Sequence, residues 1–282
     1  MEKKKTGLVL EGGAMRGLYT AGVLDVFLEE GITFDGVMGV SAGAIVGCSY
    51  ISGQHGRTLR YNRNYCRDKR FMSFYSFVTT GDLVGADFCY RELPEVLDPF
   101  DNEAFVRSET EFYVGCTNLE TGEPEYIPMK DMQTDMDYMR ASASMPYVSR
   151  IVERDGMKLL DGGCTDSVPV RKFMEMGYEK NVVVLTRPSD YRKTEGNQRL
   201  ARLFYRKYPK FAQALNRRPA AYNAMVEDLL ELERKGEIFV IRPAYPLEIG
   251  RMSHKVEEID AAYARGRADA LACLEALKQW MA

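Results

Sequence analysis

Short apolar runs alternate with helical patterns through the first fifty residues of the chain. Residues 6–11 form an apolar run that ends at two glycines, which is typical of a buried strand. Residues 14–31 then carry apolar side chains at helical spacing and end at a glycine. Residues 34–40 predict a second strand. Residues 42–52 are apolar on all sides, which indicates a buried helix.

The pattern continues along the rest of the chain. A hairpin, three strands and a closing amphipathic helix are predicted at residues 111–127, 157–163, 181–187, 237–243 and 253–281. The turn of the hairpin is expected near Thr121 and Gly122. Strand and helix alternate at a spacing that predicts parallel strands with right-handed crossovers. Because no linker or repeat interrupts the pattern, we expect one α/β domain over residues 1–282.

Composition narrows the classes of protein. The chain has 282 residues, of which 45% are hydrophobic and 28% charged, as in an ordinary soluble globular protein. A net charge of −3 gives no overall attraction to nucleic acid or to an anionic membrane. No apolar run approaches the ~18 residues of a membrane span, and the first run is too short for a signal peptide. We therefore expect a cytoplasmic protein with no nucleic-acid partner.

Cysteine and histidine usage argues against a disulfide framework and against a metal site. The six cysteines are scattered and form no CxxC pair, so we expect them to be small core residues. The two histidines, His55 and His254, lie far apart and belong to no metal-binding pattern. We expect no metal and no other cofactor.

A single serine lies at the junction of the second predicted strand and the helix after it. Ser41 is the centre of Gly39-Val40-Ser41-Ala42-Gly43, a G-x-S-x-G pattern. At so sharp a turn the hydroxyl projects outward, and small residues on both sides avoid a collision. The first turn of the next helix favours developing negative charge at that hydroxyl. The serine is thus a candidate nucleophile, and a helix N-cap is the alternative.

A glycine-rich loop follows the first predicted strand and runs from Gly12 to Gly17. Because the carboxyl ends of parallel strands share one edge of a sheet, its backbone N–H groups are expected to face a carbonyl oxygen held at Ser41. The alternative is a phosphate-binding loop of a nucleotide enzyme. The spacing G-G-x-x-x-G departs from that fingerprint, and no acidic residue ends the second strand to hold a ribose.

The proton acceptor for such a serine has two candidates. His254 lies beyond the last predicted strand, where an α/β-hydrolase carries the histidine of a Ser-His-Asp triad. The other histidine is expected in a surface loop. Asp161 ends a predicted strand, at the same edge of the sheet that is expected to hold Ser41. It is followed by Gly162 and Gly163, which leave space beside its carboxylate. A type I turn is the other interpretation of this Asp-Gly pair.

Taken in order, the motifs E-G-G-A-M-R-G, G-V-S-A-G and D-G-G resemble the patatin family of lipid acyl hydrolases. RASASMP at residues 140–146 and the pair Pro169-Val170 match as well, and the resemblance extends over residues 6–190. It implies a three-layer α/β/α sandwich with a mostly parallel sheet. It also implies a Ser–Asp dyad without histidine, and hydrolysis of fatty acyl esters, with a phospholipid or lysophospholipid as the expected substrate.

The resemblance further implies roles for individual residues. Ser41 is the implied nucleophile and Asp161 the implied base. The N–H groups implied to form the oxyanion hole are those of Gly12, Gly13 and Ala14. Arg16 is implied to fix this loop. The chain departs from the family at Ala14, where a third glycine is usual, and at Glu11, where aspartate is more common.

Two segments rich in basic and aromatic residues are candidates for lipid contact. Residues 196–226 contain seven Lys or Arg and no acidic residue, and residues 57–77 have a similar character. Such segments suit docking to anionic headgroups, and the helical segment 196–235 is also a candidate cap over an acyl pocket. A solvated helix face is the alternative. For the whole chain, the remaining alternative is a non-catalytic lipid-binding protein that keeps the fold.

Overall fold

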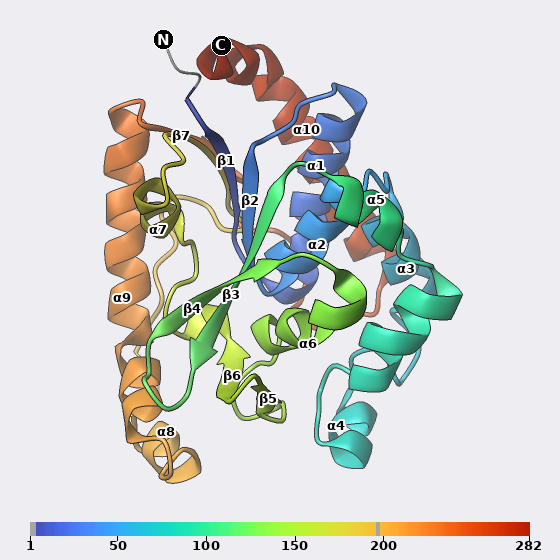
Figure 1. The fold of residues 1–282 in the computed structure, drawn as a ribbon, viewed down its shortest axis with the longest axis vertical. Helices are drawn as coiled ribbons and strands as arrows, with labels where there is room; N and C mark the ends of the chain where they lie inside the picture. Colours follow the sequence, from blue (N-terminus) through green and yellow to red (C-terminus); the bar gives the residue numbers. More distant parts are fainter. Residues whose placement is uncertain (1–3, 196–197) are drawn as a thin grey trace.

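A computed structural model describes residues 4–195 and 198–282 of the chain, in which helices flank a single sheet (Figure 1). The strands are β1 (Thr6–Leu10), β2 (Gly36–Val40), β3 (Glu111–Asn118), β4 (Pro124–Met129), β5 (Val152–Arg154), β6 (Met157–Asp161), β7 (Lys180–Val184) and β8 (Ile238–Ile241). The helices are α1 (Gly17–Glu29), α2 (Ala42–Ile51), α3 (Arg57–Tyr65), α4 (Phe74–Thr80), α5 (Asn102–Arg107), α6 (Met132–Ser142), α7 (Val170–Glu175), α8 (Gln198–Phe204), α9 (Pro209–Arg234) and α10 (Val256–Met281). A π-helix spans Phe88–Leu97, and 3₁₀ turns span Ala14–Arg16 and Gly162–Cys164.

The sheet is mostly parallel, as predicted. Its strand order is β5-β6-β3-β2-β1-β7-β8, and β4 pairs with β3 outside this path. The pairs β3–β2, β2–β1, β1–β7 and β7–β8 are parallel. The pairs β3–β4, β3–β6 and β5–β6 are antiparallel. The predicted strands are all present, with ends shifted by at most three residues. The predicted helical segment 196–235 forms α8 and α9, and residues 196 and 197 lie outside the described residues.

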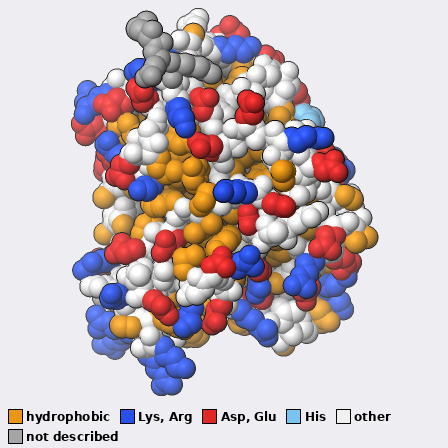
Figure 2. Space-filling view, in the orientation of Figure 1, with side chains coloured by type: hydrophobic (Ala, Val, Ile, Leu, Met, Phe, Trp, Pro, Cys, Tyr) orange, Lys and Arg blue, Asp and Glu red, His pale blue; other side chains and the backbone are white. Residues whose placement is uncertain are grey.

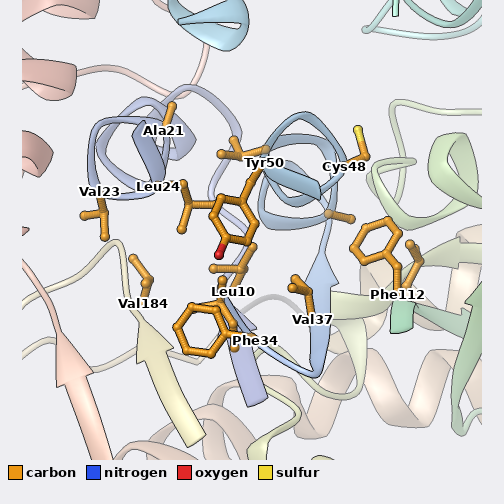
Figure 3. Close-up of a cluster of buried hydrophobic side chains, with 14 of the residues drawn as sticks. Leu10, Ala21, Val23, Leu24, Phe34, Val37, Cys48, Tyr50, Phe112 and Val184 are labelled. Carbon is orange, nitrogen blue, oxygen red and sulfur yellow. The ribbon is translucent and has the colours of Figure 1, made fainter. Parts of the chain in front are cut away.

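Side chains alternate between the two faces of the sheet and are buried on both, which is typical of parallel strands covered by helices. Leu8, Leu10 and Val37 belong to a core cluster with α1, α2 and α10. Figure 3 shows part of this cluster, in which strand side chains point toward α1 and α2. Val9 and Met38 point the other way, toward α7 and α9. The three layers expected for the fold are therefore present (Figure 1).

One edge of β3 is shared by two strands that run toward each other. Val40, the last residue of β2, pairs with Gly115 in the parallel direction. The next residue of β3, Cys116, pairs with Asp161, the last residue of β6, in the antiparallel direction. The carboxyl ends of β2 and β6 therefore meet end to end. This corrects the expectation that Asp161 reaches Ser41 along the common edge of parallel strands.

The helices α1 and α10 cross in backbone contact at two glycines. A Cβ atom on Gly22 would lie 2.1 Å from the carbonyl oxygen of Tyr263, and one on Gly266 would lie 1.9 Å from that of Tyr19. No side chain fits at either position unless the helices move apart. The closing helix is thus held against the helix that follows the glycine-rich loop.

We predict that Gly266→Ala lowers the free energy of unfolding by about 2 kcal/mol, because the added methyl group overpacks the crossing. In an uncrowded helix the same change raises the free energy of unfolding by ~1 kcal/mol. The direction of the change therefore shows whether the glycine is crowded. Urea unfolding measures it. Gly250→Ala is the control, since its Cβ would find only Ser253 N, at 4.0 Å. A Gly266→Ala protein at least as stable as the parent would contradict the close crossing.

Candidate active site

Ser41 occupies a strained turn between β2 and α2. Its backbone has φ 54° and ψ −123°, a conformation that residues with a side chain rarely adopt. The turn is held by Ser142, whose hydroxyl accepts a hydrogen bond from Ser41 N (2.8 Å) and donates one to the carbonyl oxygen of Gly115 (2.6 Å). Ser41 occupies the N-cap position of α2, but its hydroxyl makes no capping hydrogen bond to the helix.

Close backbone approach explains the glycines around this serine. A Cβ on Gly43 would lie 2.4 Å from the carbonyl oxygen of Leu10, and one on Gly39 would lie 2.6 Å from Ala44 Cα. A Cβ on Gly12 would lie 2.9 Å from the Cβ of Ser41. The glycine-rich loop therefore lies directly against the serine, as the sequence predicts.

The loop presents backbone donors beside Ser41. The residues predicted to supply them, Gly12, Gly13 and Ala14, line the same cleft as the serine. Within residues 4–195 and 198–282, their N–H groups have no hydrogen-bond acceptor. Ala14 adopts φ 50°, the left-handed conformation for which a third glycine would be suited. A Cβ on Gly17, at the end of the loop, would lie 2.9 Å from that of Ala42.

Glu11 and Arg16 tie this loop to β7 and α9. The buried Glu11 carboxylate accepts hydrogen bonds from Thr186 N (2.6 Å), Thr186 Oγ1 (3.0 Å) and the Tyr222 hydroxyl (2.9 Å). Arg16 Nε donates to Thr186 Oγ1 (3.4 Å). Burial, followed by the charge of Arg187, lowers the pKa of Arg16 to about 10. The sequence assigned no role to Glu11, and the structure shows it as an anchor between distant segments.

Asp161 is buried at the end of β6. Its Oδ1 accepts a hydrogen bond from Gly163 N (2.7 Å), and a Cβ on Gly162 would lie 2.3 Å from the carbonyl oxygen of Gly115. Burial raises the pKa of Asp161 above the usual 3.8. The charge of Arg218 opposes this rise most, and a hydrogen bond from the Ser41 hydroxyl opposes it less. The carboxylate is thus a stronger base than an exposed aspartate.

Neither histidine faces the serine. The exposed His254 ring hydrogen-bonds to the carbonyl oxygen of Cys66, and His55 Nε2 lies 2.7 Å from a carboxylate oxygen of Glu29. Neither residue lines the cavity or the cleft at Ser41. This geometry favours Asp161 over His254 as the proton acceptor.

Two hollows of different character meet at Ser41. An apolar cavity of about 140 Å³ lies on one side, and a more polar cleft of about 650 Å³ lies on the other. Ala14, Ser41 and Met145 line both. The cavity lining includes six methionines: Met15, Met72, Met132, Met136, Met139 and Met145. Methionine side chains adapt readily to the shape of an apolar ligand.

The described residues contain neither a cluster suited to a metal ion nor a helix suited to span a membrane. Across these ranges, no group of three or more His, Cys, Asp or Glu side chains is arranged to hold a metal ion. None of the described helices has the length and apolar character needed to cross a membrane.

Sequence reasoning missed several residues at the site. Ser142 lies within the RASASMP segment, but nothing local shows that its hydroxyl supports the turn at Ser41. Lys193, Arg218 and Tyr222 line the cleft. The basic and aromatic character of residues 196–235 was a sequence signal for Arg218 and Tyr222. It indicated a cap rather than particular contacts.

The chain is similar in sequence to known proteins. Residues 8–174 match the family described as patatin-like phospholipase, and residues 208–282 match a domain of unknown function, DUF6363. The uncharacterized protein YjjU of Escherichia coli (strain K12) is 28% identical over 271 residues, which cover 93% of this chain and 75% of that protein. The lysophospholipase nte1 of Aspergillus oryzae is 27% identical over 179 residues, 62% of this chain but 11% of that protein.

Among solved structures, VipD from Legionella pneumophila aligns with 97% of this chain and 67% of its own, at 12% identity and a TM-score of 0.48. The family match covers more than half of the 282 residues and includes both Ser41 and Asp161. The chain belongs to the patatin-like phospholipase family and is an ester-bond hydrolase that acts on lipid acyl groups.

Proposed function

We propose that Ser41 and Asp161 form a catalytic dyad that hydrolyses the acyl ester of a phospholipid or lysophospholipid. The observation that carries this proposal is the register on β3, where the ends of β2 and β6 occupy neighbouring positions. A buried carboxylate with a raised pKa then lies at the strained serine. The free N–H groups of the glycine-rich loop lie on the same side.

The reaction runs in two halves. Ser41 Oγ attacks the ester carbonyl carbon while Asp161 takes the hydroxyl proton, and the N–H groups of Gly12, Gly13 and Ala14 bind the developing oxyanion. The tetrahedral intermediate expels the alcohol, which receives the proton from Asp161. Water then attacks the acyl-serine, again losing a proton to Asp161, and the fatty acid leaves as Ser41 is re-protonated. Each N–H group of the oxyanion hole lowers the activation free energy by ~3 kcal/mol.

We predict that Asp161→Asn lowers kcat by at least about 10³-fold while the protein stays folded, because the amide cannot accept the serine proton. In the parent, the base works deprotonated, so activity is lost as the pH falls through the raised pKa of Asp161. The acidic limb of kcat/KM therefore lies above pH 3.8, the usual aspartate value. Steady-state kinetics on p-nitrophenyl butyrate over a range of pH measure both.

His254→Ala is the matched control and is expected to keep the activity of the parent. A phosphonate ester is expected to label the parent covalently and to spare Ser41→Ala. Loss of turnover in His254→Ala with full activity in Asp161→Asn would contradict the dyad and support a triad. Binding of lipid without labelling or turnover would support a non-catalytic protein.

We assign the acyl chain to the apolar cavity. Ser41 and Ile45 both line this cavity, and Ile45 N donates a hydrogen bond to the Ser41 carbonyl oxygen (3.1 Å), so Ile45 lies one turn of α2 from the serine. The methionine-rich remainder of the lining can adjust to chains of different length. The cleft on the other side is left for the alcohol portion of the ester.

We predict that Ile45→Phe narrows the cavity beside the nucleophile and selects against long acyl chains. The ratio of kcat/KM for p-nitrophenyl palmitate to that for p-nitrophenyl acetate should fall by about tenfold or more. Val106→Phe adds the same ring to an exposed position on α5 and should leave the ratio unchanged. An unchanged ratio in Ile45→Phe, with the protein folded, would place the acyl chain elsewhere.

The region after β7 belongs, in this proposal, to one functional unit over residues 1–282. Its strand β8 pairs with β7, and α10 packs against α1. Leu200 of α8 and Leu215, Arg218 and Tyr222 of α9 line the cleft, so these two helices form the proposed cap.

The surface beside the cleft supports peripheral contact with an anionic membrane. Leu200 of α8 and Leu83, which follows α4, both line the cleft. Phe74 on α4 is 72% exposed and Leu203 on α8 is 69% exposed. Both helices lie at the lower end of the molecule (Figure 1), and Figure 2 shows Lys and Arg side chains gathered over α8 and the lower end of α9. Apolar side chains with basic neighbours are suited to an anionic bilayer surface.

We predict that the protein sediments with vesicles containing phosphatidylglycerol more than with pure phosphatidylcholine vesicles. The double variant Phe74→Ser/Leu203→Ser should bind the anionic vesicles at least tenfold more weakly, because two exposed apolar side chains no longer enter the bilayer. Leu271→Ser, at an exposed position on α10, is the control. Equal binding to both kinds of vesicle, or an unaffected double variant, would contradict this docking surface.

A further inference from the structure

We propose that Arg187, Lys193 and Arg218 form a subsite for the phosphate of the substrate's alcohol portion, beside Ser41 and opposite the acyl cavity. The helix α9, which lies in the region matching a domain of unknown function, thereby sets a preference for acyl esters whose alcohol carries a phosphate. This inference rests on the proposed function, because it concerns the leaving-group side of the same cleft.

The three cations lack anionic partners in the described part of the chain. The Nε–H groups of Arg187 and Arg218 are buried and have no acceptor. Lys193 Nζ reaches only a hydroxyl, Ser167 Oγ, at 3.5 Å. Arg192, the neighbour of Lys193, points elsewhere and pairs with a glutamate of α9. Buried donors without partners are costly, and an anionic ligand in the cleft would supply acceptors for this cluster.

The carboxylates in the cleft offset part of this charge by attracting Lys193, but within the described residues they form no ion pair with the three cations. Glu11 and Asp161 are the two that line it. The oxygens of Glu11 accept hydrogen bonds from Thr186 and Tyr222, and Asp161 is the proposed base. Burial, followed by the charge of Arg218, lowers the pKa of Lys193 to about 7. A phosphate between the cations would relieve their mutual repulsion.

Aromatic rings and α9 hold the cations in place. The Arg187 guanidinium lies 4.2 Å from the centre of the Tyr191 ring, and Lys193 Nζ lies 3.6 Å from that of Tyr222. The backbone of Lys193 exchanges two hydrogen bonds with the Asn223 side chain, at 2.8 and 3.0 Å. Because the Tyr222 hydroxyl also donates a hydrogen bond to Glu11, α9 and the segment that carries Arg187 and Lys193 support the three cations together.

Arg218 connects the subsite to the proposed base. A Cβ on Gly163 would lie 3.4 Å from Arg218 Nη2, so the guanidinium lies against the turn that follows Asp161. In a lysophospholipid one glycerol separates the acyl ester from the phosphate, and Ser41 and Arg218 line the same cleft. Guanidinium groups suit phosphate because their planar N–H fork matches two of its oxygens, and the lysine adds a point charge.

The test compares Arg218→Gln with Arg217→Gln, which removes the same charge at the next position of α9, where the side chain is exposed. The substrates are 1-palmitoyl lysophosphatidylcholine and 1-palmitoylglycerol, which share an acyl chain and a glycerol and differ in the phosphocholine group. The parent should prefer the first in kcat/KM. Arg218→Gln should lower this preference at least tenfold, mainly through KM, and Arg217→Gln should leave it unchanged.

The proposal is overturned if the parent hydrolyses both substrates equally, or if folded Arg218→Gln keeps the preference. A parent that hydrolyses neither substrate would instead contradict the proposed function. Lys193→Gln is the second variant, should Arg218→Gln fail to fold, and the same loss of preference is expected. Because the charge of Arg218 also lowers the pKa of Asp161, the comparison is made on the pH plateau of each variant.

Competition distinguishes a headgroup from free phosphate. Glycerophosphocholine should inhibit hydrolysis of 1-palmitoylglycerol competitively, and Arg218→Gln should weaken this inhibition about tenfold. Inorganic phosphate should compete weakly at the same place, since it carries the charge without the glycerol. Non-competitive inhibition by inorganic phosphate, with none by glycerophosphocholine, would assign the cations to a separate phosphate site and overturn the headgroup role.

Discussion

The shared edge of β3 is the constraint on which the site depends. β2 and β6 approach each other along this edge and stop at neighbouring register positions, so the residues at their ends are forced together. Ser142 fastens the turn after β2 to the Gly115 carbonyl at the same place. The strain at Ser41 is therefore supported by the sheet, and the packing of helices on both faces keeps the sheet in register.

Local sequence predicted the strands, the sharp turn and the glycine-rich loop, because apolar spacing and glycine requirements are local. It could not predict that β6 runs antiparallel, since a five-residue strand carries no mark of its partner or direction. The contact between Glu11 and Tyr222 joins positions 211 apart in the chain. Such contacts depend on tertiary packing, which explains why the resemblance suggested Asp161 as the base while residues such as Ser142 and Tyr222 were missed.

Charge is distributed unevenly around the serine, and this gives the two sides different chemistry. The acyl side has an apolar, methionine-rich lining, in which a hydrocarbon chain loses water at little cost. The other side holds partly buried cations and the carboxylate of Asp161, whose pKa is raised by burial and held back by Arg218. In the proposed site, one residue of α9 thus affects both the strength of the base and the affinity for an anion.

A crystal structure of the protein reacted with an acyl-like phosphonate ester tests the dyad most directly. We predict a bond from phosphorus to Ser41 Oγ, with the Asp161 carboxylate within hydrogen-bonding distance of that oxygen. The phosphonyl oxygen should lie about 2.7–3.1 Å from backbone nitrogens of the glycine-rich loop. An adduct on another residue, or one in which His254 has moved to the serine and Asp161 makes no contact with it, would contradict the account.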